Sequence, residues 1–166
     1  MISSSSSFRI DSSDFDRGML KANAAGHRGV LRGLGLAGEA WMNDAIGDIP
    51  EAAEDTGALK SSATVHVDNK LFRISKDVWT GHSAWGSKER PTPYRGYLTD
   101  RNGRGNTATV MFNKSYAGQW HERFPKSGAF QSKRAGIKYL ENKMYTHGAI
   151  YLNIVKLELQ KALGMT

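Results

Sequence analysis

Apolar positions in the first third of the chain follow the period of a helix. Between Phe15 and Ile46 they recur mostly every three or four residues, which is the spacing of one helical face. Ser12-Ser13-Asp14 offers capping oxygens at the start, and Ile49-Pro50 closes the helix. Five glycines inside it each cost about 0.5 to 1 kcal/mol relative to alanine, and they predict a kink or tight packing there. These are Gly26, Gly29, Gly33, Gly35 and Gly38.

From Lys60 the pattern changes to the alternation of a strand. Apolar and polar side chains alternate from Ala63 to Val67, and a second run extends from Leu71 to Trp79 after Asp68-Asn69. This pattern predicts a β-hairpin. Residues 107 to 112 also alternate, and they predict a third strand. Its apolar face carries Ala108, Val110 and Phe112.

The last apolar stripe again has helical spacing, and it predicts a C-terminal helix that packs on the sheet and ends near Gly164. The main face carries Leu140, Met144, Tyr151, Val155 and Leu159, and Ile150, Ile154 and Leu157 widen it. The order of elements predicts an α+β fold. We expect a small antiparallel sheet of three to four strands, flanked by a long N-terminal helix and a C-terminal helix.

Two segments lie outside these patterns. Residues 1 to 12 are serine-rich and polar, and they predict an N-terminal arm. Residues 80 to 105 are rich in glycine and proline and show no period, and they predict a long loop. The chain has 166 residues, which suits one domain over residues 13 to 166 with this loop as an insertion.

Composition and charge narrow the classes of protein. The chain has no cysteine, which excludes disulfide scaffolds, thiolate zinc sites and cysteine nucleophiles. It shows neither a signal peptide nor an apolar stretch that could span a bilayer, so we expect a soluble protein without membrane contact. The net charge of +7 divides into −4 for residues 1 to 57 and +11 for residues 58 to 166. That division suits binding to nucleic acid, docking on an acidic protein face, or head-to-tail stacking of copies.

Motifs typical of enzymes lack their structural context. The GxGxxG at Gly33 to Gly38 lies inside a helical pattern with no strand before it. His121-Glu122 begins an HExxH pattern, but Pro125 stands where the second histidine is needed. There is no GxSxG elbow. The other histidines are scattered singly, and they are His27, His66, His82 and His147. We therefore expect no catalytic residues, no metal and no cofactor.

The loop at residues 80 to 105 mixes basic and aromatic side chains. This mixture contacts phosphates and stacks on bases, and it also suits docking on an acidic protein partner. We predict contacts with a partner or another subunit by Arg90, Arg95, Arg101, Arg104, Tyr94 and Tyr97.

Two separated motifs resemble one family. The segment from Pro50 to Ser62 contains Asp55-Thr56-Gly57-Ala58-Leu59, and it resembles the DTGAL signature of minor capsid and head-tail neck proteins of tailed bacteriophages. Tyr116-Ala117 with His121-Glu122, followed by Gly136 and Lys138-Tyr139-Leu140-Glu141, resembles the YA…HE…GxKYLE stretch of the same family. The resemblance spans residues 14 to 163. The serine-rich arm and the loop at 80 to 105 depart from it.

The resemblance implies a structural virion protein that is not an enzyme. Such proteins assemble in the host cytoplasm as a homomeric ring at the neck, where head meets tail, and contact other connector and tail proteins. The alternatives are a tail-terminator or stopper ring, or a basic nucleic-acid-binding module, and an unrecognised enzyme is a third possibility. DNA that passes through the ring's lumen is a further possible partner.

The motif residues have a physical interpretation of their own. Side-chain oxygens of Asp55 and Thr56 bind nearby backbone N–H groups, and Gly57 permits a backbone conformation that other residues resist, so together they build a corner. We expect Tyr116 and Trp120 to pack at the sheet edge. His121 and Glu122 are expected to anchor the segment that leads into the last helix through hydrogen bonds.

Overall fold

The computed structural model describes residues 13–48, 52, 58–76, 106–114, 117–122 and 136–165. The predicted arm at 1 to 12, the loop at 80 to 105 and the corner at Asp55-Thr56-Gly57 lie outside these residues. The described elements are the helices α1 (Ser13–Gly47), α2 (Ala117–Glu122) and α3 (Tyr139–Ala162), a 3-10 turn (Lys60–Ser62), and the strands β1 (Ala63–Val67), β2 (Lys70–Ile74) and β3 (Ala108–Phe112). The expected α+β fold is confirmed.

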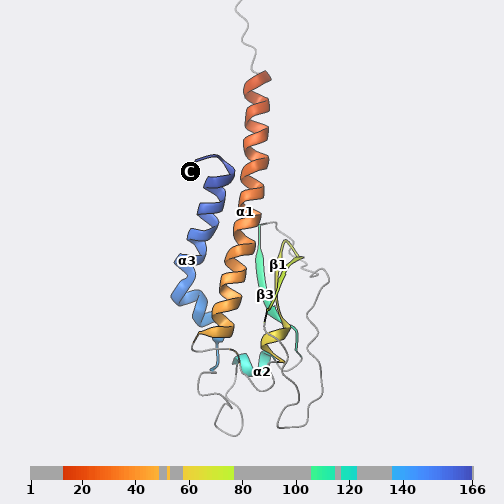
Figure 1. Ribbon diagram of the computed structural model, residues 1–166, viewed down its shortest axis with the longest axis vertical. Helices are drawn as coiled ribbons and strands as arrows, with labels where there is room; N and C mark the ends of the chain where they lie inside the picture. Colours follow the sequence, from red (N-terminus) through yellow and green to blue (C-terminus); the bar gives the residue numbers. More distant parts are fainter. Residues whose placement is uncertain are drawn as a thin grey trace, which may run out of the picture.

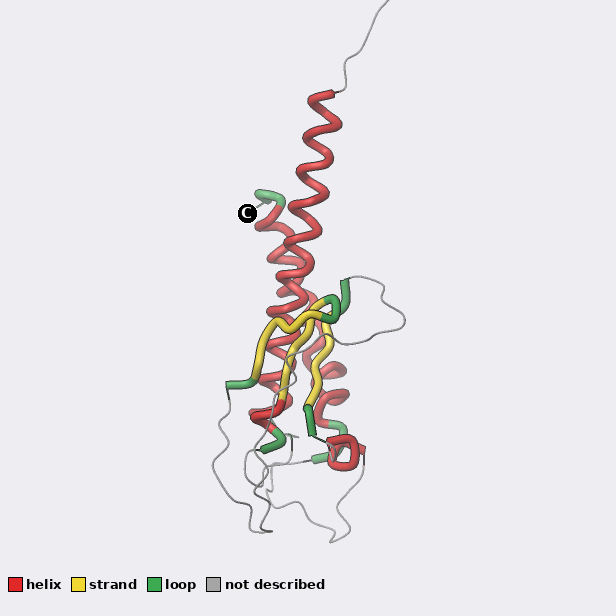
Figure 2. Tube along the Cα trace, turned by 90° about the vertical axis from the view of Figure 1, so that its right-hand side faces the viewer, coloured by secondary structure: helices red, strands yellow, loops and turns green. Residues whose placement is uncertain are grey.

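Helix α1 is the central element of the molecule. It lies between α3 on one side and the sheet on the other, and its N-terminal turns, before Gly26, extend beyond both (Figures 1 and 2). It runs unbroken for 35 residues, so the glycines mark tight packing and not a kink. A Cβ on Gly33 would lie 2.7 Å from Val155 Cα in α3, and one on Gly38 would lie 2.6 Å from Val65 Cγ1 in β1. Glycines on two sides of one helix thus let it approach both neighbours.

The sheet is antiparallel, with strand order β2-β1-β3. The predicted hairpin joins β1 to β2 through Asp68 and Asn69, which both have positive φ (46° and 65°), as the tight two-residue turn of a hairpin requires. Asp68 also ties the turn to β3, because its Oδ1 accepts a hydrogen bond from Thr107 N at 3.0 Å. The predicted third strand is confirmed.

The core forms where α1 covers the sheet. In the middle strand both faces are buried: Val65 is 0% exposed, and Thr64 and His66 on the opposite face are 0% and 1% exposed. The cluster of buried apolar residues comprises Met42, Ala45, Ile46, Ala52, Leu59, Ala63, Val65, Val110, Phe112, Ala117 and Tyr139. The core therefore joins α1, the sheet and the first turn of α3.

Helix α3 packs along α1, and the prediction that it packs on the sheet was wrong. Its first turn does reach β3, because the rings of Tyr139 and Phe112 meet edge to face with centroids 5.3 Å apart. Beyond that turn it follows the glycine side of α1, where the lack of side chains lets the two helices come close. Met144, Ile150 and Leu157, which were expected to be core residues, are 43–59% exposed.

The C-terminal end of α3 is where the sequence predicted it. Gly164 has φ +69°, the left-handed conformation that ends many helices. Its N–H donates to Lys161 O at 3.1 Å, and Met165 N–H donates to Gln160 O at 3.0 Å. These two bonds form a Schellman cap, which satisfies carbonyls that the end of a helix would otherwise leave without donors.

Two glycine substitutions in α1 should have opposite effects. Gly33→Ala places a methyl group against the backbone of α3 and should lower the free energy of unfolding by about 1 to 3 kcal/mol. Gly18→Ala meets nothing within 4 Å and should raise it by about 0.5 to 1 kcal/mol, since alanine favours a helix. Urea denaturation of both variants measures the difference. Equal effects of the two changes would show that α1 and α3 do not pack this closely.

Candidate functional site

The sequence-predicted site residues fall into two groups. The predicted contact residues of the loop and Tyr116 lie outside the described residues, as do Asp55, Thr56 and Gly57. His121 and Glu122 are described, and both belong to the short helix α2, which the sequence analysis did not predict.

His121 and Glu122 join α2 to the start of α3. Glu122 Oε2 lies 2.8 Å from Lys138 Nζ, and the carbonyl of His121 accepts a hydrogen bond from Lys138 N at 2.7 Å. The His121 ring also contacts the Tyr139 ring edge to face. Lys138 has φ +57°, a strained conformation for a residue with a side chain, and these bonds hold it there. The hydrogen bond from Lys138 lowers the pKa of the Glu122 carboxyl, and a second bond from His121 adds to the effect.

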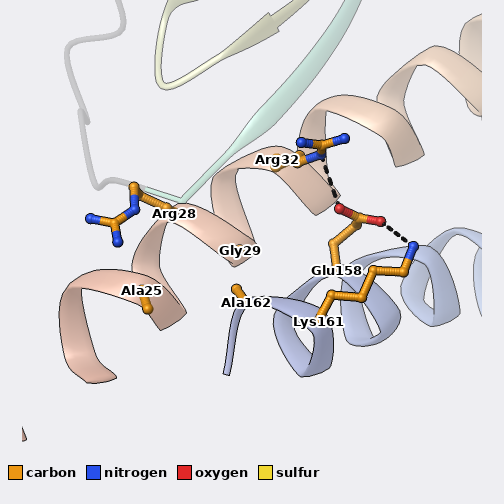
Figure 3. A pocket seen from close by; sticks show the side chains of 7 residues that line it. All are labelled: Ala25, Arg28, Gly29, Arg32, Glu158, Lys161 and Ala162. Carbon is orange, nitrogen blue, oxygen red and sulfur yellow. Dashed lines mark hydrogen bonds and ion pairs between the residues drawn. The ribbon is translucent and has the colours of Figure 1, made fainter. Parts of the chain in front are cut away.

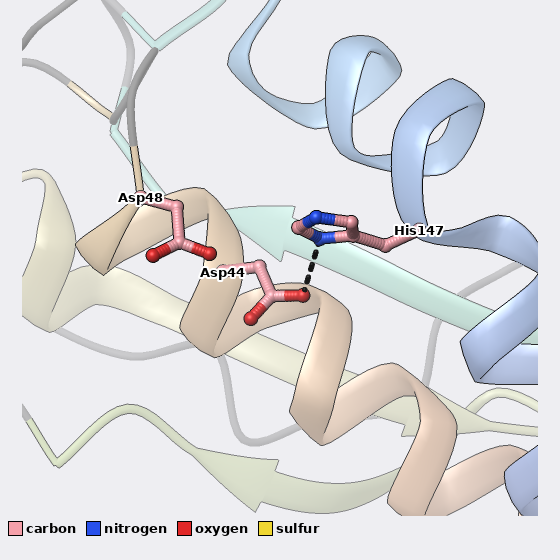
Figure 4. Close-up of side chains that lie close together, drawn as sticks. All are labelled: Asp44, Asp48 and His147. Carbon is pink, nitrogen blue, oxygen red and sulfur yellow. Dashed lines mark hydrogen bonds and ion pairs between the residues drawn. The ribbon is translucent and has the colours of Figure 1, made fainter.

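A second group of titratable residues joins α1 to α3. Asp44 Oδ2 accepts a hydrogen bond from the Tyr151 hydroxyl at 2.6 Å and lies 3.0 Å from His147 Nδ1. Asp48 lies one helical turn beyond Asp44, on the same side of α1 (Figure 4). Burial, followed by the bond to Asp44, raises the pKa of the buried Tyr151 hydroxyl. That hydroxyl therefore remains protonated at neutral pH and acts as a donor.

The histidines that the sequence shows scattered singly include one, His147, that lies in a cluster of acidic side chains. Asp44, Asp48 and His147 each offer one ligand atom, and these atoms lie within 4.8 Å of one another. His147 and Tyr151 are four residues apart and so share a face of α3, which the sequence does show. Their pairing with Asp44 depends on the register in which α3 packs along α1. The helical period of the sequence does not predict that register.

A pocket of about 590 Å³ lies where the C-terminal end of α3 meets α1 (Figure 3). Its lining is rich in charge, with three basic side chains and one acidic side chain. The lining residues are Ala25, Arg28, Gly29, Arg32, Glu158, Lys161 and Ala162. Gly29 forms part of the floor, and a Cβ there would lie 2.7 Å from Ala162 Cβ. The sequence analysis did not identify this pocket.

Glu158 organises the basic side chains of this pocket. Its Oε2 lies 3.0 Å from Arg32 Nε, and its Oε1 accepts a hydrogen bond from Lys161 Nζ at 2.8 Å. Only 11% of the Glu158 side chain is exposed, whereas Arg32 and Lys161 are 73% and 59% exposed. The hydrogen bond from Lys161 is the main cause that lowers the pKa of the Glu158 carboxyl. A mostly buried carboxylate thus holds two cations at the rim.

Removing the Tyr151 hydroxyl should weaken the contact between α1 and α3. Tyr151→Phe leaves Asp44 without its buried donor and should lower the free energy of unfolding by about 1 to 3 kcal/mol. The matched control is Tyr145→Phe, which removes the hydroxyl of a tyrosine that is 87% exposed on the same helix. Thermal unfolding should distinguish the two variants. Similar melting temperatures would contradict a stabilising role for the Asp44 bond.

Glu158 should make the stability of the protein depend on acid pH. Because its pKa is lower in the folded chain than the usual 4.5, its stabilising effect is complete above the unfolded-state pKa. That effect is lost as pH falls through the folded-state pKa, below 4.5. Glu158→Gln should therefore be less stable than the parent at pH 7, and the two chains should become equally stable in strong acid. Urea denaturation across this pH range measures the difference in their free energies of unfolding. A difference that stays constant with pH would contradict the stabilising role of the Glu158 carboxylate.

Comparison with known proteins gives no match: no family model, no curated protein and no solved structure is similar to this chain. None of the helices in the described part of the chain is both long and apolar enough to cross a membrane.

Proposed function

We propose that this chain is a structural protein of a tailed-phage virion that forms a homomeric ring at the head-tail junction and joins head to tail. Two kinds of support carry the proposal. One is the pair of motifs, in the order and context given above, that resemble neck proteins. The other is the exposed apolar surface of α1 and α3, which suits a subunit that is completed by its neighbours.

The projecting end of α1 is the observation on which the proposal mainly rests. Phe15, Met19 and Leu20 are 69%, 56% and 69% exposed, although they are large and apolar. Phe15 and Met19 continue the side of α1 that packs against α3 further along, past the point where α3 ends. Grouped apolar side chains on a surface mark contacts with other molecules. A neighbouring subunit is the partner that a ring supplies.

A different apolar surface lies on α3. Its exposed members are Met144, Tyr145 and Leu152, which share one side of the helix, whereas the exposed Ile150 and Leu157 lie on another side. Met144 and Leu152 also line an apolar groove of about 150 Å³ that reaches Trp41 on α1 and Ala108 on β3. A closed ring needs two unlike surfaces on each subunit, one for each neighbour. The α1 end of one subunit and the side of α3 that carries Met144 and Leu152 on the next satisfy this requirement.

The motif residues have structural roles in this proposal. Ser62 Oγ donates to Leu59 O at 2.7 Å in the turn before β1, and both residues are buried. His121 and Glu122 hold the start of α3 through Lys138. The Ser62 bond closes the turn before β1, and the contacts of His121 and Glu122 fix α2 relative to α3.

The experiment that tests the function is electron microscopy of a lysate in which the gene carries an early stop codon. Heads and tails should accumulate unjoined, because each part forms without the ring that links them. Supplying the intact gene from a plasmid should restore joined particles. Normal virions from the stop-codon strain would overturn the proposal.

The projecting apolar end of α1 can be tested in the same strain. A plasmid that carries Phe15→Ala with Met19→Ala should fail to restore joining, because the substitutions remove apolar contact area between subunits. The isolated chain should keep its melting temperature, since both side chains are largely exposed. Lys70→Ala with Lys76→Ala, on exposed positions of β2 and the residues after it, is the control and should restore joining. Full restoration by the α1 variant would remove this surface from the proposed interface.

A further inference from the structure

Four basic residues form a straight row on α1, here called the α1 basic stripe. They are Arg17, Lys21, Arg28 and Arg32. Their spacings of four, seven and four residues place them within about 60° of the helix circumference and along roughly 22 Å of its length. By the same geometry, the apolar Phe15 and Met19 lie on about the opposite side of the helix. The projecting end of α1 therefore has one apolar side and one basic side.

The stripe is accessible along its whole length. The side chains of Arg17 and Arg32 are 70% and 73% exposed, and Lys21 and Arg28 are exposed as well. The N-terminal turns of α1, before Gly26, stand clear of the sheet and of α3 (Figures 1 and 2), whereas Arg28 and Arg32 lie beside the tip of α3. Lys21 and Arg28 form no ion pair within the described part of the chain. Their charges are thus available to a partner.

The stripe ends in the charged pocket at the tip of α3. There Glu158 holds Arg32 from α1 and Lys161 from α3, while the Arg28 guanidinium extends away from this ion-paired group (Figure 3). In the Schellman cap, carbonyls at the end of α3 accept hydrogen bonds from backbone N–H groups. These bonds reduce the repulsion between the carbonyls and an anion. Among the residues that the structure describes, this surface carries five basic side chains and two carboxylates, Asp14 and Glu158. The surface therefore keeps a net positive charge.

The shape of this surface favours a linear polyanion. Its cations are separated by steps of roughly 6 and 10 Å along a rigid rod, and double-helical DNA carries one phosphate charge per about 1.7 Å of its axis. A duplex that lies along the stripe thus presents phosphates to every cation. The centres of protein–protein interfaces, although enriched in arginine, are depleted of charged residues as a whole and enriched in aromatic groups, and the stripe contains no aromatic or large aliphatic side chain.

We propose that the α1 basic stripe, together with Lys161, binds the phosphate backbone of double-helical DNA without regard to base sequence. The choice of DNA as partner rests on the proposed function, because the genome passes through the neck. Glu158 acts as a positioning residue that holds Arg32 and Lys161 toward the duplex. This surface is separate from the predicted contacts at Arg90, Arg95, Arg101 and Arg104.

The test measures binding of the purified full chain to a fluorescein-labelled duplex by anisotropy, over a range of salt concentrations. The informative variant is Lys21→Gln with Arg28→Gln, because neither residue forms an ion pair in the described structure. Each lost phosphate contact should reduce the slope of log K against log salt by about 0.9, so the variant should lose about 1.8. Lys70→Gln with Lys76→Gln makes the same change in net charge on the hairpin and should leave the slope unchanged.

Two further measurements identify the binding partner and the surface of the protein that binds it. Polyglutamate at the same charge concentration should compete poorly with the duplex; equal competition would overturn DNA as the partner. Arg90→Gln with Arg95→Gln tests the loop, and a slope that falls only in that variant would overturn the role of the stripe. Equal losses in the stripe variant and the hairpin control would also overturn it, because binding would then follow net charge alone. Melting temperatures confirm that each variant is folded.

The outcomes are independent of those for the neck role. A chain that joins heads to tails but shows no salt-dependent binding to the duplex overturns this inference and leaves the ring proposal standing. Normal virions in the stop-codon strain, together with the predicted loss of slope, refute the neck role and support DNA binding by the stripe.

Discussion

The close approach of α1 to both of its neighbours is the constraint on which the rest of the structure depends. Gly33 admits the backbone of α3 on one side, and Gly38 admits Val65 of the sheet on another. If either side carried larger residues, α3 or the sheet would move outward. The bonds of Asp44 to Tyr151 and of Glu158 to Arg32 span the α1–α3 contact, so they form only when the helices are this close.

The two ends of α1 have different surroundings, and this difference connects the fold to the proposed assembly. Toward its C-terminus, Met42 and Ile46 are buried in the core. Toward its N-terminus, Met19 and Lys21 lie on nearly opposite sides of α1, in the part that projects beyond α3 and the sheet. One continuous helix thus carries the core of its own subunit at one end and surfaces for other molecules at the other. Such an arrangement suits an assembly component better than an isolated domain.

The sequence predicted the elements more completely than the contacts between them. Alternation from Ala63 to Val67 and the Asp68-Asn69 turn were sufficient for the hairpin, because strand period and turn chemistry are local. The packing of α3 on α1 was not predicted, because an apolar stripe indicates that one face of a helix is buried but does not identify the element that buries it. For the same reason the pairing of Asp44 with His147 and of Arg32 with Glu158 was not expected. Each pair joins residues more than a hundred positions apart, through the register of two helices.

The unbroken path of α1 has a mechanical consequence. The glycines on the two packed sides of α1 fix the rotation of the helix about its own axis. The packed part therefore determines the direction of every side chain on the projecting part, several turns away. One residue inserted at Ala24-Ala25 would turn Arg17 and Lys21 by about 100° relative to Arg28 and Arg32, without disturbing a single core contact. An insertion in the projecting part would therefore redirect its apolar side and its basic side together, whereas a substitution there changes one side chain.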